Sequence, residues 1–212
     1  MSIALTTDRK AIVGVEQRLS PNTSRVFSPR FAVLHYTAGP SAEGALERFA
    51  KSDSQVSAHF VIDKQGHIYQ CAPLNVAAWH AGESFWKPAQ SPGKLLGLKN
   101  LNRFSFGIEM VNAGPLRRSQ GGAFYTWWGQ QVPPNEIVEV EPGEAGSFNR
   151  RYWARYPEEQ IASAIELVSL LVHEFKLEEI LGHSDIAPGR KQDPGPAFPM
   201  RHIRSVIQGR NS

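Results

Sequence analysis

The residues best suited to chemistry lie in a fifteen-residue stretch near the C-terminus, residues 182–196. This stretch holds one histidine, two aspartates, an arginine and a lysine among three glycines and three prolines. Because proline lacks a backbone donor and glycine loses much conformational entropy in a helix, we expect a stiff loop rather than a helix. We predict that His183 and Asp193 bind a metal ion together with the distant His35. Lys191 would lie beside the ion as a fixed positive charge.

Two histidines and one carboxylate form a common ligand set for a catalytic zinc ion, which keeps a fourth position open. Zinc lowers the pKa of water toward ~7 and polarises a carbonyl oxygen. A carboxylate that is not a ligand must then accept the proton of the water, and a cation must stabilise the oxyanion. Glu109 is the candidate for the first role, because a carboxylate inside an apolar strand is unfavourable unless it is paired or bound. Lys191 is the candidate for the second, and the pattern predicts hydrolysis of an amide or similar bond.

The residue types alone leave other chemistries open. The same ligand set suits non-haem Fe(II) oxygenases. Cys71 and His80 would together form a thiol hydrolase, although no pattern supports this pair, and a free cysteine is more often a small buried hydrophobe. A serine triad from residues 183–185 is disfavoured, because adjacent side chains cannot converge. Cys71 is the only cysteine, so the chain forms no internal disulfide.

The apolar pattern indicates which elements carry these residues. Residues 31–36 and 104–111 are predicted strands, so His35 and Glu109 each lie near the end of an apolar strand. Residues 157–176 predict the clearest helix, with one continuous apolar stripe. The other expected helices and strands are those at residues 41–51, 56–62, 67–70, 177–181 and 199–207.

Strands and helices are mixed without strict alternation, which predicts an α/β (mixed) fold with a central mixed β-sheet flanked by helices. At 212 residues we expect a single catalytic domain, residues 31–212, preceded by an N-terminal arm, residues 1–30, with one short strand. Residues 113–156 are too long for an ordinary connection and predict a loop excursion within the domain. We expect most of its aromatic residues to anchor the excursion to the body, with stacking on sugar rings as the alternative.

Composition narrows the class of protein. Hydrophobic residues make up 41% and charged residues 20%, which is typical of a folded globular chain. The net charge of +3 favours carboxylate-bearing partners only weakly, and without a concentrated basic stripe or motif we expect no nucleic-acid partner. No signal peptide and no run of ~20 apolar residues is found, so we expect synthesis in the cytoplasm without membrane insertion. Release or export would be needed for the protein to act outside the cytoplasm, and no pattern indicates an oligomeric state.

Five blocks of sequence, in this order, resemble the type 2 N-acetylmuramoyl-L-alanine amidases over residues 30–208. The blocks are LHYTAG at 34–39, SAHFVID at 57–63, AWHAG at 78–82, SFGIEMVN at 105–112 and GHSDIAPGRKQDPG at 182–195. That family includes cytosolic and envelope cell-wall amidases, phage endolysins and the peptidoglycan recognition proteins. The last block is highly specific for the family.

The resemblance implies a zinc hydrolase that cleaves the amide bond between N-acetylmuramic acid and L-alanine in peptidoglycan or muropeptides. It implies the zinc ligands His35, His183 and Asp193, the general base Glu109, the transition-state stabiliser Lys191, and the groove-lining residues His80, Asn112 and Arg190.

Two features depart from the simplest members of that family. Ala58 takes the place where some phage members carry a tyrosine, so proton transfer would depend on Glu109. The excursion over residues 113–156 is also unusually long.

The alternative function is that of a recognition module that binds without cutting. Such modules lack a metal ligand, whereas this chain retains all three with Glu109 and Lys191, which favours the enzyme.

Overall fold

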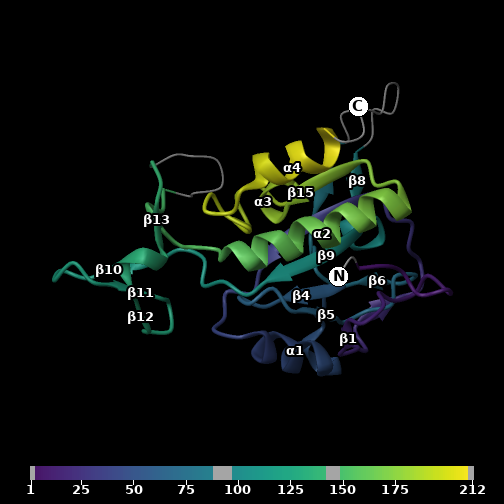
Figure 1. Ribbon diagram of the computed structural model, residues 1–212, viewed down its shortest axis with the longest axis horizontal. Coiled ribbons are helices and arrows are strands. Elements are labelled where there is room, and N and C mark those ends of the chain that lie inside the picture. Colours follow the sequence, from purple (N-terminus) through teal and green to yellow (C-terminus); the bar gives the residue numbers. More distant parts are fainter. Residues whose placement is uncertain (1–2, 88–96, 142–148, 210–212) are drawn as a thin grey trace.

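A six-stranded mixed β-sheet forms the centre of the protein, as the computed structural model in Figure 1 shows. The structure describes residues 3–87, 97–141 and 149–209. In sheet order, the strands are β1 (Glu16–Gln17), β5 (Ile68–Gln70), β4 (Phe60–Ile62), β9 (Ser105–Met110), β3 (Phe31–Tyr36) and β15 (Glu179–Gly182). Within this sheet β4 and β5 pair antiparallel, and the other neighbouring pairs are parallel. The predicted mixed α/β class is therefore confirmed.

Alternation of side chains along the strands gives the sheet two different faces. On one face, Leu34 and Ile108 belong to a core that includes side chains of α2 (Glu158–Phe175) and α4 (Met200–Gln208). On the other face, Val61 packs with side chains of α1 (Ala42–Ala50). Figure 1 places α1 on the opposite side of the sheet from α2 and α4. The face that carries α1 is only partly covered, and it carries the functional residues described below.

The long helix α2 begins directly after Pro157 and ends at Phe175. Glu158 and Glu159 lie in its first turn, where carboxylates complement the positive end of the helix dipole. The predicted apolar stripe packs into the core, which includes the fully buried Leu167. Across the residues that the structure describes, no helix has the length and apolar character needed to span a membrane.

The prediction of a strand over residues 56–62 was wrong in its first half, because β4 begins only at Phe60. The preceding segment is bonded to the N-terminal arm. Asn22 Nδ2 donates to the Val56 carbonyl at 3.0 Å, and Ser57 Oγ donates to the Asn22 carbonyl at 2.6 Å. Such side-chain bonds give the backbone an alternative to the strand ladder.

The prediction of a loop over residues 182–196 was wrong at its start, because α3 (His183–Ile186) forms one helical turn. Those four residues include no glycine or proline. The Asp185 carboxylate also accepts a hydrogen bond from the Gly182 amide at 2.8 Å. The prolines follow Ile186, and from there the chain continues as a loop.

The N-terminal arm contributes two short strands where one was expected. β1 pairs with β5 at the edge of the main sheet, and β2 (Thr23–Ser24) pairs antiparallel with β6 (Ala77–Ala78). The remaining short elements are the paired strands β7 (Phe85–Trp86) and β8 (Leu98–Lys99) and the 3-10 turns Ser52–Ser54, Leu101–Arg103 and Pro134–Glu136.

The excursion over residues 113–156 forms two small sheets, and the first projects from the body in Figure 1. The first contains β10 (Arg117–Arg118), β11 (Phe124–Tyr125) and β12 (Gln131–Val132), and the second pairs β13 (Ile137–Glu139) with β14 (Tyr152–Ala154). Trp153 is 1% exposed and anchors the excursion, as expected, whereas Trp127 is 62% exposed. Residues 142–148 of the excursion lie outside the described residues.

Candidate metal centre

The register of the parallel strands brings the predicted residues to one place. His35 on β3 pairs directly with Glu109 on β9, so their side chains share one face of the sheet. Gly182 at the end of β15 pairs with Leu34, so the next residue, His183, enters the site level with His35. The carboxyl ends of adjacent parallel strands are where ligand sites in α/β sheets generally form.

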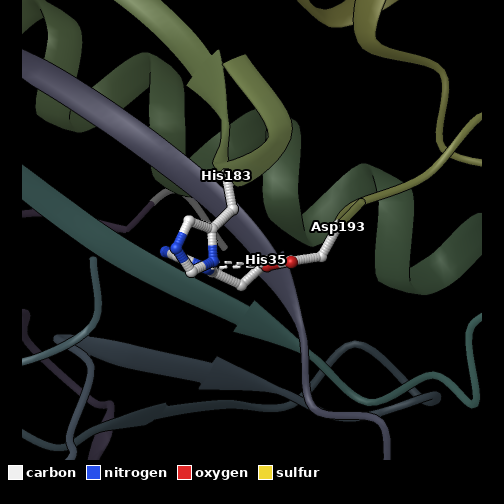
Figure 2. Close-up of side chains that lie close together, drawn as sticks. All are labelled: His35, His183 and Asp193. Atoms are coloured by element: carbon white, nitrogen blue, oxygen red, sulfur yellow. Dashed lines mark hydrogen bonds and ion pairs between the residues drawn. The ribbon is translucent and has the colours of Figure 1, made fainter. Parts of the chain in front are cut away.

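Three donor atoms converge at this point (Figure 2). His35 Nδ1, His183 Nδ1 and Asp193 Oδ2 lie 2.9 Å from one another in all three pairs. The residues are 1%, 3% and 7% exposed, respectively. They come from β3, from the first residue of α3 and from the loop that follows α3. This group has the arrangement of residues that can hold a metal ion.

The chemistry of these donors fits a cation. Burial, helped by the neighbouring His183, lowers the pKa of His35 to about 4, so its ring is neutral at neutral pH. Burial alone would raise the pKa of Asp193, but the rings of His183 and His35, which donate to its carboxylate whenever their Nδ1 atoms are protonated, hold that pKa below its usual range. A carboxylate and ring nitrogens packed this closely concentrate lone pairs in a buried space. Such an arrangement is favourable only with a proton or a cation between them.

The second ring nitrogen of His183 is held by the backbone. His183 Nε2 lies 3.0 Å from the Ala81 carbonyl, which can only accept, so Nε2 carries the proton and Nδ1 presents a lone pair to the centre. Arg190 Nη2 donates to the same carbonyl at 2.9 Å and also to the Glu83 carbonyl. Arg190 therefore ties the loop after α3 to the loop after β6.

Glu109 and Lys191 line a cavity of about 900 Å³ together with the three converging residues. Glu109 Oε2 is buried and has no hydrogen-bond partner among the residues described. Burial, with a further contribution from Asp193, raises the pKa of Glu109 to about 8, although the Lys191 charge opposes this. A buried carboxylate oxygen without a partner is costly, which is typical of a group that meets a ligand.

The three predicted groove residues lie in different surroundings. His80 and Arg190 line the cavity, whereas Asn112 lies outside its lining. Asn112 Nδ2 donates to the carbonyls of Ala154 and Arg155, at 3.2 Å each, and Asn112 Oδ1 accepts from the Gly114 amide at 2.7 Å. Asn112 thus fastens the beginning of the excursion to its end. A role in substrate binding stays a prediction for all three.

Sequence reasoning missed two cations of the cavity wall. Arg48 comes from the last turn of α1, and Arg150 comes from the excursion shortly before β14. Neither lies in a recognisable block, and arginines are common on exposed helix faces and loops. No signal in one sequence separates these two from other surface cations. Ala58, the position that departs from some phage members, is completely buried and offers no group for proton transfer.

Residues 25–196 match the model of the N-acetylmuramoyl-L-alanine amidase family. The chain belongs to this family. The match covers His35, His183 and Asp193, and it also covers Glu109 and Lys191. Membership also confirms the resemblance drawn from the five sequence blocks.

Known members of the family are moderately similar to this chain. It is 30% identical over 186 residues to the N-acetylmuramoyl-L-alanine amidase AmiD of Escherichia coli (strain K12), which covers 82% of this chain and 52% of AmiD. It is 29% identical over 153 residues to the 1,6-anhydro-N-acetylmuramyl-L-alanine amidase AmpD of Salmonella typhimurium (strain SL1344), covering 72% of this chain and 58% of AmpD. The matches thus span little more than half the length of these relatives.

A solved structure shares the fold. The crystal structure of a Se-Met AmpD derivative superposes with a TM-score of 0.63 at 21% sequence identity. The superposition covers 96% of this chain and 99% of that chain, so the fold is shared over nearly its whole length.

Proposed function

We propose that this protein is a zinc-dependent amidase that hydrolyses the bond between N-acetylmuramic acid and L-alanine in peptidoglycan or its soluble fragments. One observation carries the proposal: two buried histidines and a buried aspartate converge beside an unpartnered glutamate in a member of this family. The names of AmiD and AmpD specify the same amide bond. The alternative recognition module has no feature of the site in its favour.

His35, His183 and Asp193 would hold the zinc ion, since two imidazoles and one carboxylate are a frequent catalytic zinc set. When bound, zinc supplies Lewis acidity, which polarises a carbonyl group and makes water a better nucleophile at neutral pH. The burial of the three side chains excludes bulk water from the inner side of the site.

Glu109 is the proposed general base. Its free oxygen accepts a proton from the attacking water, and the same carboxyl group then gives that proton to the departing L-alanine nitrogen. A pKa raised toward neutral makes the carboxylate a stronger base for the proton of the water and still allows the carboxyl group to give that proton up. The position of Glu109, next to His35 across the strand pair, lets it act at the metal centre without being a ligand.

Lys191 is the proposed stabiliser of the oxyanion that forms when the carbonyl carbon becomes tetrahedral. It lies two residues before Asp193 and lines the same cavity. Among the residues that the structure describes, no carboxylate lies within 4.0 Å of its ammonium group as an ion-pair partner. The ammonium group is therefore available to the developing negative charge.

The outer part of the cavity suits a stem peptide with free carboxylates. Arg48, Arg150 and Arg190 bring positive charge to its wall, and Trp79 adds an aromatic surface. Guanidinium groups bind carboxylates through paired hydrogen bonds. His80 and Asn112 complete the set of residues that we propose to shape the groove, Asn112 by fixing the base of the excursion.

Digestion of a purified N-acetylmuramoyl tripeptide, followed by mass spectrometry, tests this function. We expect N-acetylmuramic acid with a free lactyl carboxyl group and a peptide with a free L-alanine amine. Dialysis against a chelator should abolish the products, and added zinc should restore them. An intact muropeptide that stays bound to the metal-loaded protein would instead identify a recognition module.

A further inference from the structure

The metal-facing nitrogen of His35 depends on what its other nitrogen contacts. A neutral imidazole carries one proton, so a bond at one nitrogen fixes the state of the other. His35 Nε2 lies 2.9 Å from Nδ1 of His80, a residue in the loop directly after β6. Because either ring can donate in this contact, the distance alone does not show which of the two nitrogens carries the proton. The contacts of the other His80 nitrogen, Nε2, decide it.

The surroundings of Ser105 decide the proton position on His80. His80 Nε2 lies 3.1 Å from the Ser105 carbonyl and 3.3 Å from Ser105 Oγ. The carbonyl can only accept, and the single hydroxyl proton of Ser105 is donated to the Leu101 carbonyl at 2.7 Å. Both atoms therefore present lone pairs to His80 Nε2, so Nε2 must carry the proton of the neutral ring. His80 Nδ1 is then an acceptor, and His35 Nε2 must donate to it.

We propose that His80 is a positioning residue that fixes the tautomer of His35, so that the lone pair of His35 Nδ1 faces His183 and Asp193. This inference rests on the metal centre of the proposed function and adds a residue to it. The hydrogen-bond chain runs from His35 Nε2 to His80 Nδ1, and from His80 Nε2 to Ser105. With His183 held by the Ala81 carbonyl, both metal-facing nitrogens are then free of protons.

The packing around His80 holds its ring in this place. A Cβ atom at Gly107 would lie 2.3 Å from His80 Cγ, so the ring occupies space that any other residue at 107 would fill. The His80 amide is fixed by the Asn102 side chain, whose Oδ1 accepts from it at 3.0 Å. The ring meets that of His35 edge to face, at 5.0 Å and 79°. Both ring nitrogens of His80 are thus engaged within the protein.

Nitrogen-15 NMR of the histidines in the metal-free protein tests the tautomer directly. We expect His35 and His80 as Nε2–H tautomers at neutral pH, which two-bond correlations to the ring protons distinguish. A His35 ring protonated at Nδ1 would overturn the proposal. This measurement needs no zinc, so it decides the role of His80 even if the protein binds no metal and the proposed function fails.

Zinc affinity of two His80 variants provides the second test. His80→Phe fills the space but accepts no hydrogen bond, and we expect its zinc affinity to fall on the order of 10–100-fold. His80→Asn keeps an acceptor near the position of Nδ1 and should recover most of that loss. Unchanged affinity in His80→Phe would contradict the proposal.

The matched control is His59→Phe. His59 is another buried histidine, with a ring centroid 6.1 Å from that of His80, and its bonds run to Val76 and Gly107 rather than to a ligand. This variant loses a comparable pair of hydrogen bonds, so it measures the cost of disturbing the interior. We expect its zinc affinity to match the wild type. A loss equal to that of His80→Phe would show a general packing effect and overturn the specific role of His80.

Discussion

The metal centre and the excursion over residues 113–156 differ in how the chain fixes their side chains. The centre takes His35 and Glu109 from six-residue strands in register, and each ligand histidine has a second hydrogen bond behind it. The excursion consists of strands of two or three residues, and Trp127 at its turn is largely exposed. The residues of the centre are placed by the register of long strands, whereas the outer excursion combines short strands with a hydrogen bond to the body, from Trp127 Nε1 to the Ala38 carbonyl at 2.7 Å.

The two regions meet where the excursion returns to the body. Trp153 packs against Gly195, where a Cβ atom would lie 2.5 Å from the indole ring. Tyr156 Oη donates to the Pro194 carbonyl at 2.7 Å, directly after Asp193. The excursion therefore has a base that supports the loop of Asp193 and an outer part that does not contact this loop. Substitutions in the two regions test this division.

Removing one of the three proposed ligands should abolish zinc binding. In Asp193→Ala, two neutral imidazoles remain without the carboxylate, so we expect loss of bound zinc together with loss of hydrolysis. Metal analysis of the purified, folded variant checks this. The control is Glu139→Ala on the excursion, which removes an exposed carboxylate that pairs with Arg151 at 2.6 Å; this variant should keep its zinc. Zinc retained by Asp193→Ala would remove this residue from the ligand set.

Removing the base should separate chemistry from metal binding. Glu109→Gln keeps the size of the side chain but cannot accept a proton, so we expect the turnover rate to fall about 10²–10⁴-fold. Zinc content should remain that of the wild type, because Glu109 is not among the three converging ligands. Unchanged turnover would assign the proton transfer to another group.

Within the excursion, two tryptophans should behave differently. Trp153→Ala removes a buried indole and should lower the free energy of unfolding by about 3–5 kcal/mol. Trp127→Ala changes an indole that is 62% exposed and removes its hydrogen bond to the Ala38 carbonyl, so we expect a smaller loss of about 0.5–1.5 kcal/mol. Urea denaturation of both variants provides the comparison. Equal losses would show that the excursion is fixed along its whole length.

The smallest effect is expected at Cys71, which tests the thiol-hydrolase alternative. Burial raises the pKa of Cys71 to about 12, so the thiol stays protonated at neutral pH and is a poor nucleophile. A thiol reagent should leave the folded protein unmodified and react only after unfolding. Cys71→Ala should hydrolyse muropeptides at the wild-type rate. A folded Cys71→Ala variant without activity would support the thiol-hydrolase alternative.

The elements that the sequence predicted correctly are those with a clear apolar period. The strand at residues 31–36 is as expected, and the long helix differs by one residue at each end. Hydrophobic burial dominates in these segments, and its period is visible in a single sequence. The proposed ligands and the proposed base were predicted from residue types and the family blocks. The pairing of His35 with Glu109 could not be derived, because register depends on contacts between distant segments.

The incorrect predictions fall where polar side chains compete with the local pattern. The Asn22 side chain bonds to the backbone at Val56, and residues 56–59 do not join the strand. Asp185 stabilises a helical turn in a stretch rich in glycine and proline. The bond between His80 and His35 has no signature either, since their positions in the chain show no fixed spacing. Strands of two residues, as in most of the excursion, are too short to carry a period.

Hydrolysis of a defined muropeptide in water enriched in oxygen-18 shows which bond the protein cuts. We expect one heavy oxygen in the lactyl carboxyl group of N-acetylmuramic acid and none in the released peptide, with no product after the metal is removed. A heavy oxygen in a peptide carboxyl group would place the cut at another bond, and an unlabelled, intact muropeptide would contradict the proposed hydrolysis.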